Sequence, residues 1–178
     1  MKVKMKVRVK GGKKDAAYGR CAQCRARSCQ ASKLVVGYPV LPVTPLSFQD
    51  IATRLARWQF PERLDGVVGI ASGGVVPAAL VAQRLGLEMK VIALNYRDEA
   101  NEPRYPAPQV LAPAPDVLGW RRILLVDDVY VSGKSWHAAR ALLPTDAEVL
   151  PFVLKGKVEF ALIRDVDGCV QWPWRVYV

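Results

Sequence analysis

The sequence predicts an α/β fold in which helices cover both faces of a central, mostly parallel sheet. Short apolar runs rich in β-branched residues alternate with stretches of helical periodicity, and such runs are typical of strands buried on both faces. Two of these runs, 67–71 and 123–126, are followed directly by small or charged residues, at the edge where open α/β sheets bind ligands. The chain has 178 residues, 51% of them hydrophobic, which is enough for one domain with appendages.

Charge separates the chain into two parts. Residues 1–33 hold eleven of the 26 Lys and Arg residues but only one of the 16 acidic residues, so this arm carries the whole net charge of +10. The predicted domain, residues 34–178, is therefore neutral, which argues against a chain-wide nucleic-acid-binding face. We expect the arm to be a disordered or non-native leader that contacts nucleic acid at most weakly, with an edge strand as the alternative.

The cysteine and hydropathy patterns bear on whether the chain has a zinc site, a membrane span or a signal peptide. Cys21, Cys24 and Cys29 include a CxxC pair, but a zinc site would need a fourth ligand, and only His137 and Cys169 remain in the chain. No apolar run reaches the roughly 18 residues that span a bilayer, and the lysine-rich start lacks an apolar signal core. We therefore expect a cytoplasmic protein. We expect His137, the single histidine of the chain, to be an exposed helix residue.

Residues that cap or stop helices mark where the predicted elements begin and end. Ser47 is a residue type that caps helices, Gly86 follows a helical stretch, and Pro144 stops another. In chain order we expect an extended edge segment at 35–43, a helix at 47–58, a strand at 67–71, a helix at 77–85, a strand at 89–94, a loop at 95–119, a strand at 123–126, a helix at 136–143 and a strand at 147–154. The long loop is rich in proline, and such loops in compact domains are usually functional.

The predicted strand at 123–126 leads into the most informative stretch of the chain. Asp127 and Asp128 follow it, and residues 132–135 then read Ser-Gly-Lys-Ser. Backbone N–H groups, two hydroxyls and one ammonium in such a turn suit a phosphate dianion, whereas the two carboxylates suit sugar hydroxyls or a hydrated metal ion. A nucleoside-triphosphate loop is excluded, because it needs a glycine five residues before its Gly-Lys, where this chain has Asp128.

A second group of small residues follows the strand at 67–71. Ser72, Gly73 and Gly74 lead into the next helix, and adjacent glycines let backbone N–H groups approach an anion with no Cβ in the way. An ordinary tight turn from strand to helix is the alternative for these three residues.

Residues 123–135, an apolar strand followed by two acidic residues and a small-residue loop, resemble the phosphoribosyl pyrophosphate motif of the type I phosphoribosyltransferases. The resemblance covers roughly residues 34–178 and implies that family's fold, with a small hood or flap beside the sheet. It implies that Asp127 and Asp128 are the catalytic pair that holds the ribose hydroxyls, with Mg²⁺ bound at Asp128 through water. It also implies two phosphate sites: one for the 5′-phosphate at Val131, Ser132, Gly133, Lys134 and Ser135, and one for pyrophosphate at Ser72, Gly73 and Gly74.

In the resembled family, the segment that matches the long loop is a flap that closes over the sugar-pyrophosphate. Tyr96, Arg97 and Arg104 are the residues that we expect to shield the reaction from water. Solvated loop charges and a packing tyrosine are the alternative for these three.

The C-terminal stretch 168–174 resembles the tail of the xanthine-guanine and related 6-oxopurine phosphoribosyltransferases, in which a Pro-Trp pair lies beside the nucleobase. Lys155 stands where that group has a lysine facing the 6-oxo oxygen. The resemblance implies a base site formed by Lys155, Cys169, Val170 and Trp174. The alternatives are an exposed strand-end lysine and tryptophans that cover the end of the sheet.

Two residues depart from the 6-oxopurine pattern. Val131 stands where these enzymes usually have an aspartate near N7 of the base, and valine cannot transfer a proton. Cys169 stands where many of them have a base-stacking aromatic residue. The resemblance therefore implies a purine phosphoribosyltransferase with an open choice of base.

The expected function is purine salvage by a homodimeric pentosyltransferase that uses phosphoribosyl pyrophosphate and Mg²⁺. Two alternatives remain open from the sequence. One is a regulatory protein that senses phosphoribosyl pyrophosphate, which Val131 favours; the other is a phosphoribosyltransferase for a different base. Lys155 and the Trp-Pro-Trp tail favour the purine enzyme, because a sensor needs no base site.

Overall fold

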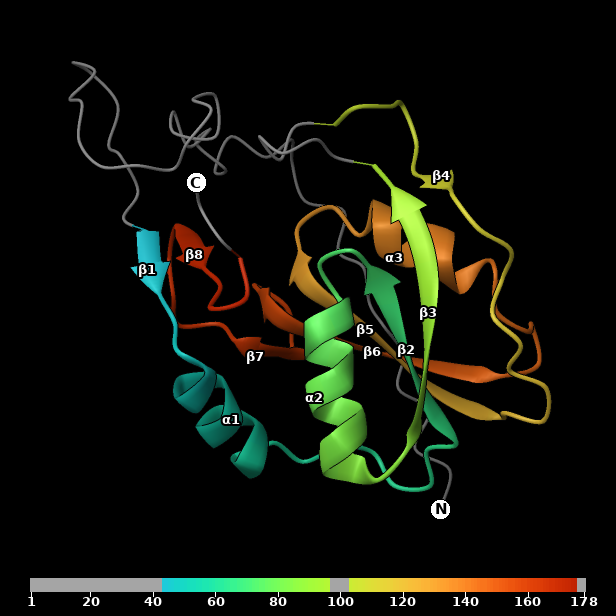
Figure 1. Cartoon of the computed structure of the whole chain (residues 1–178), viewed down its shortest axis with the longest axis horizontal. Helices are drawn as coiled ribbons and strands as arrows, with labels where there is room; N and C mark the ends of the chain where they lie inside the picture. Colours follow the sequence, from blue (N-terminus) through green and yellow to red (C-terminus); the bar gives the residue numbers. More distant parts are fainter. Residues whose placement is uncertain (1–42, 97–102, 176–178) are drawn as a thin grey trace.

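The computed structural model describes residues 43–96 and 103–175. They form a central sheet of six strands in the order β4-β3-β2-β5-β6-β7 and a separate two-stranded sheet of β1 and β8 (Figure 1). The strands are β1 Val43–Pro45, β2 Gly66–Ala71, β3 Glu88–Asn95, β4 Gln109–Val110, β5 Arg122–Tyr130, β6 Glu148–Gly156, β7 Ala161–Ile163 and β8 Cys169–Gln171. Neighbours in the central sheet are parallel, except that β4 is antiparallel to β3. The predicted α/β class is confirmed.

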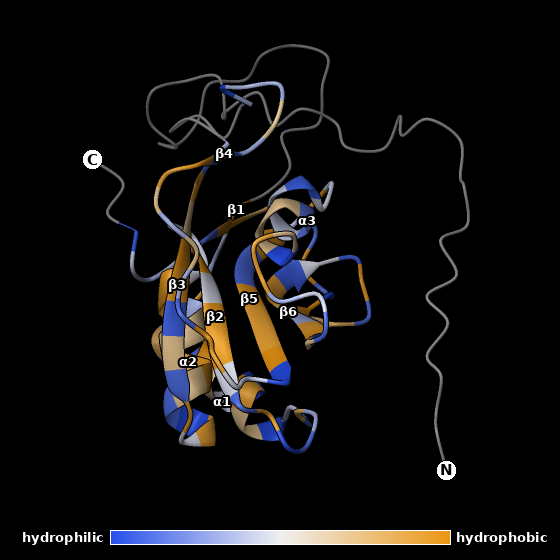
Figure 2. Ribbon diagram, turned by 90° about the vertical axis from the view of Figure 1, so that its right-hand side faces the viewer, coloured by the Kyte–Doolittle hydropathy of each residue, from blue (hydrophilic) through white to orange (hydrophobic). Residues whose placement is uncertain are grey.

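Helices cover both faces of the central sheet. The cores place α1 (Phe48–Arg57) and α2 (Val75–Leu85) on one face and α3 (Lys134–Arg140) on the other (Figure 1). Alternate residues of β5 point to opposite faces of the sheet and pack into the two hydrophobic cores there. Leu124 and Val126 pack with α1 and α2, whereas Ile123 and Leu125 pack with α3. In Figure 2, β5 is orange along this apolar stretch and blue toward both of its ends.

α1 begins where its capping residue predicts and α2 ends where its glycine predicts, whereas α2 begins at Val75, two residues before the predicted start. Ser47 caps α1 through a capping box in which its hydroxyl accepts the Asp50 N–H at 3.0 Å and the Asp50 carboxylate accepts the Ser47 N–H at 2.9 Å. Gly86 ends α2 in the left-handed conformation, with φ of 66°, which costs glycine little.

The small sheet brings the two ends of the described chain together. β1 pairs in parallel with β8, so that Val43 lies opposite Cys169. The tail that follows β8 packs onto the domain: Trp172 is buried in the core beneath α1 and α2, and the Trp174 ring stacks on it with centroids 5.1 Å apart and planes 8° apart. The C-terminal tail therefore has a fixed position beside the central sheet.

Several element boundaries differ from the prediction. β5 continues to Tyr130, so Asp127 and Asp128 lie inside the strand and not beyond it, because pairing with β6 extends to Gly156. α3 starts at Lys134, two residues before the predicted start, because Gly133 with φ of 74° turns the chain into the helix. It ends at Arg140, three residues before the predicted end, because the N–H groups of Leu142 and Leu143 donate to carbonyls three residues back in tight turns. The sequence does not predict β4, β7 and β8, whose two or three residues are too short to show a period.

The basic arm at 1–33 with its three cysteines, and all but the last residue of the segment at 35–43, lie outside the described residues. Within the described part of the chain, no helix is long and apolar enough to cross a membrane.

Candidate active site

The order of the strands creates a switch point between β2 and β5. From β2 the chain passes through α2 to β3 on one side, and from β5 it passes through α3 to β6 on the other. The helices α2 and α3 accordingly lie on opposite faces of the sheet. Loops leaving such neighbouring strands diverge, and ligands of open α/β proteins bind at this edge. The residues after β2 and the end of β5 are those that the sequence singles out.

The pairing of β5 explains why its end is accessible to the β2 turn. β2 lies beside β5 only from Gly66 opposite Ile123 to Gly69 opposite Val126. Beyond Val126, β5 is held by β6 alone, through Tyr130 opposite Gly156. Asp127 and Asp128 therefore occupy the part of the strand that β2 has already left.

Asp128 is the buried acidic residue of the site. Its side chain is 11% exposed, and its Oδ2 accepts a charge-assisted hydrogen bond from Arg175 Nη2 at 3.1 Å. Burial raises the pKa of the Asp128 carboxyl, while the Arg175 charge acts in the opposite direction. Arg175 thus favours the ionised form of a carboxylate whose burial favours the protonated form.

Asp127 lies beside it and is only partly buried. Its Oδ1 accepts the backbone N–H of Asp128, the next residue along the strand, at 2.9 Å. Burial raises the pKa of Asp127 well above its usual value, and the negative charge of Asp128 adds to the rise. Two interacting carboxylates with raised pKa values form a local centre that a further positive charge would stabilise.

The glycine turn after β2 packs directly against this centre. A Cβ on Gly73 would lie 2.5 Å from Asp128 Cγ, and a Cβ on Gly74 would lie 2.5 Å from the Val126 carbonyl oxygen. Both positions therefore exclude any side chain. Gly74 is also the N-cap of α2, and its N–H donates to the Ile70 carbonyl at 2.8 Å. The structure brings the predicted turn at 72–74 together with Asp128.

The loop after β5 leads from the acidic pair into α3. Val131 and Ser132 are exposed, whereas Gly133 is buried under the Tyr130 ring, where a Cβ would lie 2.8 Å from Tyr130 Cζ. The Tyr130 ring is held in turn by an edge contact with Phe160, with centroids 5.2 Å apart. The predicted phosphate loop at 131–135 is thus fixed at its glycine and open to solvent before it.

The flap residues differ from one another in their surroundings. Tyr96 is buried, at 7% exposure, and the Lys134 ammonium lies 5.5 Å from the centroid of its ring. Arg104 is exposed, and its backbone N–H donates to the Tyr96 carbonyl at 2.8 Å. Arg97 lies outside the described residues. Tyr96 therefore connects the start of the long loop to the phosphate loop.

Of the predicted base residues, Lys155 at the end of β6 lies near Cys169 at the start of β8, and Val170 and Trp174 follow in β8 and the tail. Lys155 Nζ donates to the Gly168 carbonyl, and burial lowers the pKa of Lys155, against the opposing charges of Cys169 and Asp167. Val170 and Trp174 pack against the core beneath α1 and α2, and Trp174 lies 5.9 Å from the Phe48 ring. The structure thus combines a partly buried lysine with a thiol and an aromatic tail.

Two residues at the site are missed by the sequence analysis. Arg175 pairs with Asp128, yet no spacing or period connects a residue after β8 to one in the middle of β5. Tyr130 supports Gly133, and its place directly before the loop was a signal of proximity but not of its role.

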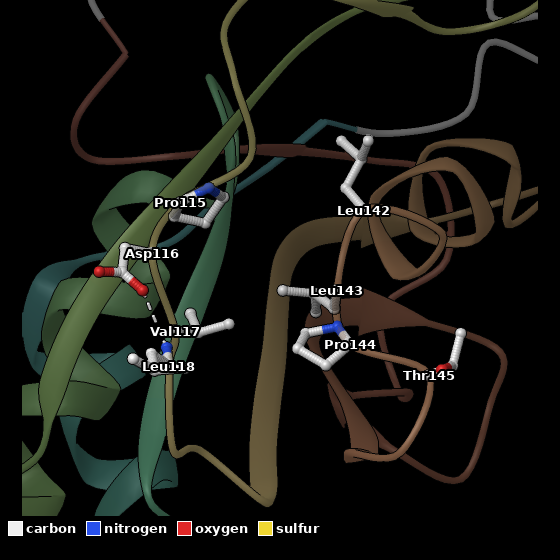
Figure 3. A pocket seen from close by; sticks show the side chains of 8 residues that line it. All are labelled: Pro115, Asp116, Val117, Leu118, Leu142, Leu143, Pro144 and Thr145. Carbon is white, nitrogen blue, oxygen red and sulfur yellow. Dashed lines mark hydrogen bonds between the residues drawn. The ribbon is translucent and has the colours of Figure 1, made fainter.

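The described chain also contains an open groove of about 470 Å³ that is separate from these residues. It lies between the segment before β5 and the segment after α3, where Val117 and Leu143 point toward one another (Figure 3). The groove is lined by Pro115, Asp116, Val117, Leu118, Leu142, Leu143, Pro144 and Thr145. None of the predicted site residues lines it, so the groove and the acidic centre are different features.

A doubly wound sheet whose polar residues converge at the β2–β5 switch point defines an open α/β protein, a class that binds its ligands at this edge. More specifically, this chain belongs to the phosphoribosyl transferase domain family, whose model matches residues 46–163, well over half of the chain. The match ends at β7, so β8 and the C-terminal tail lie beyond it.

Individual relatives agree with this membership. The chain is 27% identical over 134 residues to the xanthine-guanine phosphoribosyltransferase of Idiomarina loihiensis, which covers 71% of this chain and 82% of that protein. The purine phosphoribosyltransferase structure from Pyrococcus horikoshii matches with a TM-score of 0.54 at 20% identity, over 76% of this chain and 95% of that one. The Helicobacter pylori xanthine-guanine-hypoxanthine phosphoribosyltransferase matches with a TM-score of 0.56 at 17% identity, again over 76% and 95%.

These similarities confirm the predicted type I phosphoribosyltransferase fold and the prediction of a pentosyltransferase enzyme. The roles of individual residues remain predictions, which the geometry described above makes specific.

Proposed function

We propose that the protein transfers a phosphoribosyl group from phosphoribosyl pyrophosphate to a 6-oxopurine and releases pyrophosphate, as in purine salvage. The observation that carries this proposal is the position of Asp127 and Asp128 between the glycine turn at 72–74 and the loop at 131–135. The glycine turn suits pyrophosphate, and the loop at 131–135 suits a 5′-phosphate. A ribose that joins the two would lie over the acidic pair.

The reaction joins a ring nitrogen of the base to C1 of the ribose and breaks the bond from C1 to the pyrophosphate oxygen. Positive charge develops on the sugar as that bond breaks, so catalysis depends on positioning and on stabilising the leaving group. Asp127 and Asp128 would accept hydrogen bonds from the ribose hydroxyls. The backbone of Gly73 and Gly74 would hold the departing pyrophosphate.

The donor set fits Mg²⁺, which binds oxygen ligands and is usually held by one or two carboxylates together with substrate phosphates. Among the described residues, no group of three or more His, Cys, Asp or Glu side chains could hold a metal ion alone. Asp128 is the residue that would hold it, with Asp127 beside it. When bound, the ion would neutralise charge on the leaving pyrophosphate.

Lys155 supports the choice of a 6-oxopurine. Its ammonium is partly buried and already donates to a carbonyl oxygen, that of Gly168. The 6-oxo oxygen of hypoxanthine, guanine or xanthine is an acceptor of the same kind, and its partial negative charge grows as the ring nitrogen attacks. A point cation is suited to that site. The chain's similarity to a xanthine-guanine phosphoribosyltransferase agrees with this choice.

Val131 supports the alternative of a regulatory protein that senses phosphoribosyl pyrophosphate. Its side chain is 46% exposed at the start of the phosphate loop and offers no proton-transfer group. Binding of the sugar-pyrophosphate without turnover would follow if this position must carry an acid. A phosphoribosyltransferase for another base is the third reading.

A panel of bases separates these three functions. The full chain would be incubated with Mg²⁺, phosphoribosyl pyrophosphate and, in turn, hypoxanthine, guanine, xanthine, adenine, orotate and uracil, and pyrophosphate release would be measured. We expect turnover with at least one 6-oxopurine. Turnover only with another base would redirect the assignment, and saturable phosphoribosyl pyrophosphate binding without turnover would support the sensor.

The proposed setting is the cytoplasm, and the proposed assembly is a homodimer. Sedimentation of the full chain at micromolar concentration would test the dimer, since a monomer there would remove that part of the proposal.

A further inference from the structure

The ion pair between Arg175 and Asp128 differs from the others in the described chain. In the other five pairs, the side chain of the acidic partner is at least 57% exposed, whereas that of Asp128 is 11% exposed. Exposed pairs contribute little, but a buried carboxylate depends on its partner. Arg175 is therefore the main cationic partner that the structure gives to this acidic centre.

The guanidinium of Arg175 reaches the place where the proposed function requires a cation. Asp128 lies against Gly73, so its carboxylate, the pyrophosphate turn and the Arg175 side chain meet at one point. A divalent ion held by Asp128, directly or through water, would place a second positive charge beside the carboxylate with which Arg175 now pairs. The two cations would therefore compete for Asp128.

The Arg175 side chain can separate from Asp128 without disturbing the packing of the tail on the core. Trp172 is buried, and Trp174 is stacked on it, but the Arg175 side chain is 49% exposed. Its backbone is held within the tail by one hydrogen bond, from its N–H to the Trp172 carbonyl at 3.2 Å. Release of the side chain would uncover Asp128 while Trp172 stays in place.

We propose that Arg175 is an internal counter-ion that occupies Asp128 in the free protein and is displaced when a divalent cation binds there with the pyrophosphate-bearing substrate. The C-terminal tail then loosens as the site is filled. This inference rests on the proposed function, because that function is the reason why a cation binds at Asp128.

A titration with Mg²⁺ or Mn²⁺ in the presence of inorganic pyrophosphate, which supplies the phosphate ligands that the two aspartates lack, tests the competition without any sugar substrate. Mg²⁺ and Mn²⁺ affinities would be measured by calorimetry on the full chain, for the wild type and for Arg175→Gln, Arg175→Lys and Asp128→Asn. We expect Arg175→Gln to bind the ion roughly three- to tenfold more tightly, since it lacks the competing charge. Arg175→Lys, which keeps the charge, should stay close to the wild type, and Asp128→Asn should lose the binding.

The chain offers a matched control in Arg54. It forms a pair with Asp165 at the same 3.1 Å separation, with both side chains exposed. Arg54→Gln therefore removes the same charge from an ion pair of the same length away from Asp128, and its cation affinity should equal that of the wild type.

Hydrogen exchange measures the loosening of the tail. In the wild type, Mg²⁺ with phosphoribosyl pyrophosphate should accelerate exchange of the Trp174 and Arg175 amides severalfold. In Arg175→Gln, the substituted position and Trp174 should already exchange fast and respond little to the ligands.

The inference is overturned if Arg175→Gln binds cations no more tightly than the wild type, if no variant binds them, or if ligands leave tail exchange unchanged. Failure of the proposed function has a different signature. Absence of turnover with every base would remove the enzyme assignment, whereas a tighter cation affinity in Arg175→Gln would still support the competition at Asp128.

Discussion

Gly73 and Asp128 are in contact across the switch point of the sheet, with no room for a Cβ between them: such an atom would lie 2.5 Å from Asp128 Cγ. Gly73→Ala must therefore displace either the glycine turn or the carboxylate. Because a shift of about 1 Å at a reacting centre costs about 10²-fold in rate, we expect kcat/KM to fall by that order. Steady-state kinetics with phosphoribosyl pyrophosphate and the best base would measure it.

Gly86→Ala provides the control for this variant. Gly86 has φ of 66° and open space around its Cβ position, so alanine there costs about 1 kcal/mol of stability through backbone strain alone. It should leave kcat/KM unchanged. Equal losses of activity in the two variants would show that Gly73→Ala acts through general destabilisation and not through Asp128.

Asp128→Asn tests the buried carboxylate itself. The amide keeps the shape of the side chain but removes the charge that the ribose and the metal would use, so we expect turnover to fall by about 10²-fold or more. The fold should persist, because the core around β5 is apolar and unchanged. Circular dichroism would verify the fold, and unaltered kinetics would exclude Asp128 from the mechanism.

The raised pKa of Asp127 predicts how stability depends on pH. Burial, and next the charge of Asp128, place this pKa well above the usual 3.8, so the folded state binds the proton more tightly than the unfolded chain. The stabilisation is complete below pH 3.8 and is lost as pH rises through the folded-state pKa. Asp127→Asn removes this loss. Urea unfolding should therefore show a gain in stability over the wild type at pH 8 that is smaller or absent at pH 4.

In the same urea unfolding experiment, Asp65→Asn should lower stability at pH 8, whereas Asp127→Asn should raise it. Hydrogen bonds from the Arg121 and Arg122 backbone N–H groups lower the pKa of Asp65, so its stabilisation is present above the usual 3.8 and is lost as pH falls. This variant should therefore be destabilised at pH 8 and at pH 4, and the effect should shrink only as pH falls below 3.8. If Asp127→Asn behaves in the same way as Asp65→Asn, the burial argument for Asp127 is wrong.

The sequence predicts the central sheet well because buried parallel strands form continuous apolar runs. The runs at 67–71, 89–94 and 123–126 lie within strands of the central sheet, and the run at 147–154 lies within β6 except for its first residue. It also places the glycine turn and the acidic pair at one edge, since the carboxyl ends of parallel strands share an edge. That proximity is confirmed by the packing of Gly73 on Asp128.

Contacts that depend on the distant C-terminal tail could not be predicted. β1 and β8 have three residues each and are recognisable only from their pairing with one another. The pair of Arg175 with Asp128 joins segments that share no local pattern, and it depends on how Trp172 docks into the core. Long-range packing sets these contacts, and a single sequence carries no periodic sign of it.

Lys155 should control the alkaline side of the pH profile. Burial lowers its pKa from the usual 10.5, although nearby Cys169 and Asp167 oppose the change. As pH rises, we expect kcat/KM for a 6-oxopurine to begin to fall before pH 10.5 is reached, because the ammonium loses its proton. Lys155→Met should lower kcat/KM and remove this decline.

Lys157→Met and Cys169→Ser are the controls for Lys155. Lys157 is exposed and pairs with Asp167 at 3.1 Å, so its loss should leave the alkaline decline in place. Cys169→Ser removes the thiol that lies near Lys155. A decline that disappears in Cys169→Ser but persists in Lys155→Met would assign it to the thiol instead.

Val131→Asp tests whether the missing acid limits the reaction. The side chain is 46% exposed at the start of the phosphate loop, so we expect the free energy of unfolding to change by no more than about 0.5 kcal/mol. In the resembled 6-oxopurine enzymes, an aspartate at this place lies near N7 of the base. A positioned acid or base contributes about 10²-fold, so kcat should rise by at least about tenfold with hypoxanthine, guanine or xanthine. Val131→Asn supplies a similar shape without a transferable proton and should not reproduce the gain. If the two variants have the same kcat, proton transfer at position 131 does not limit turnover, and the valine is compatible with full activity.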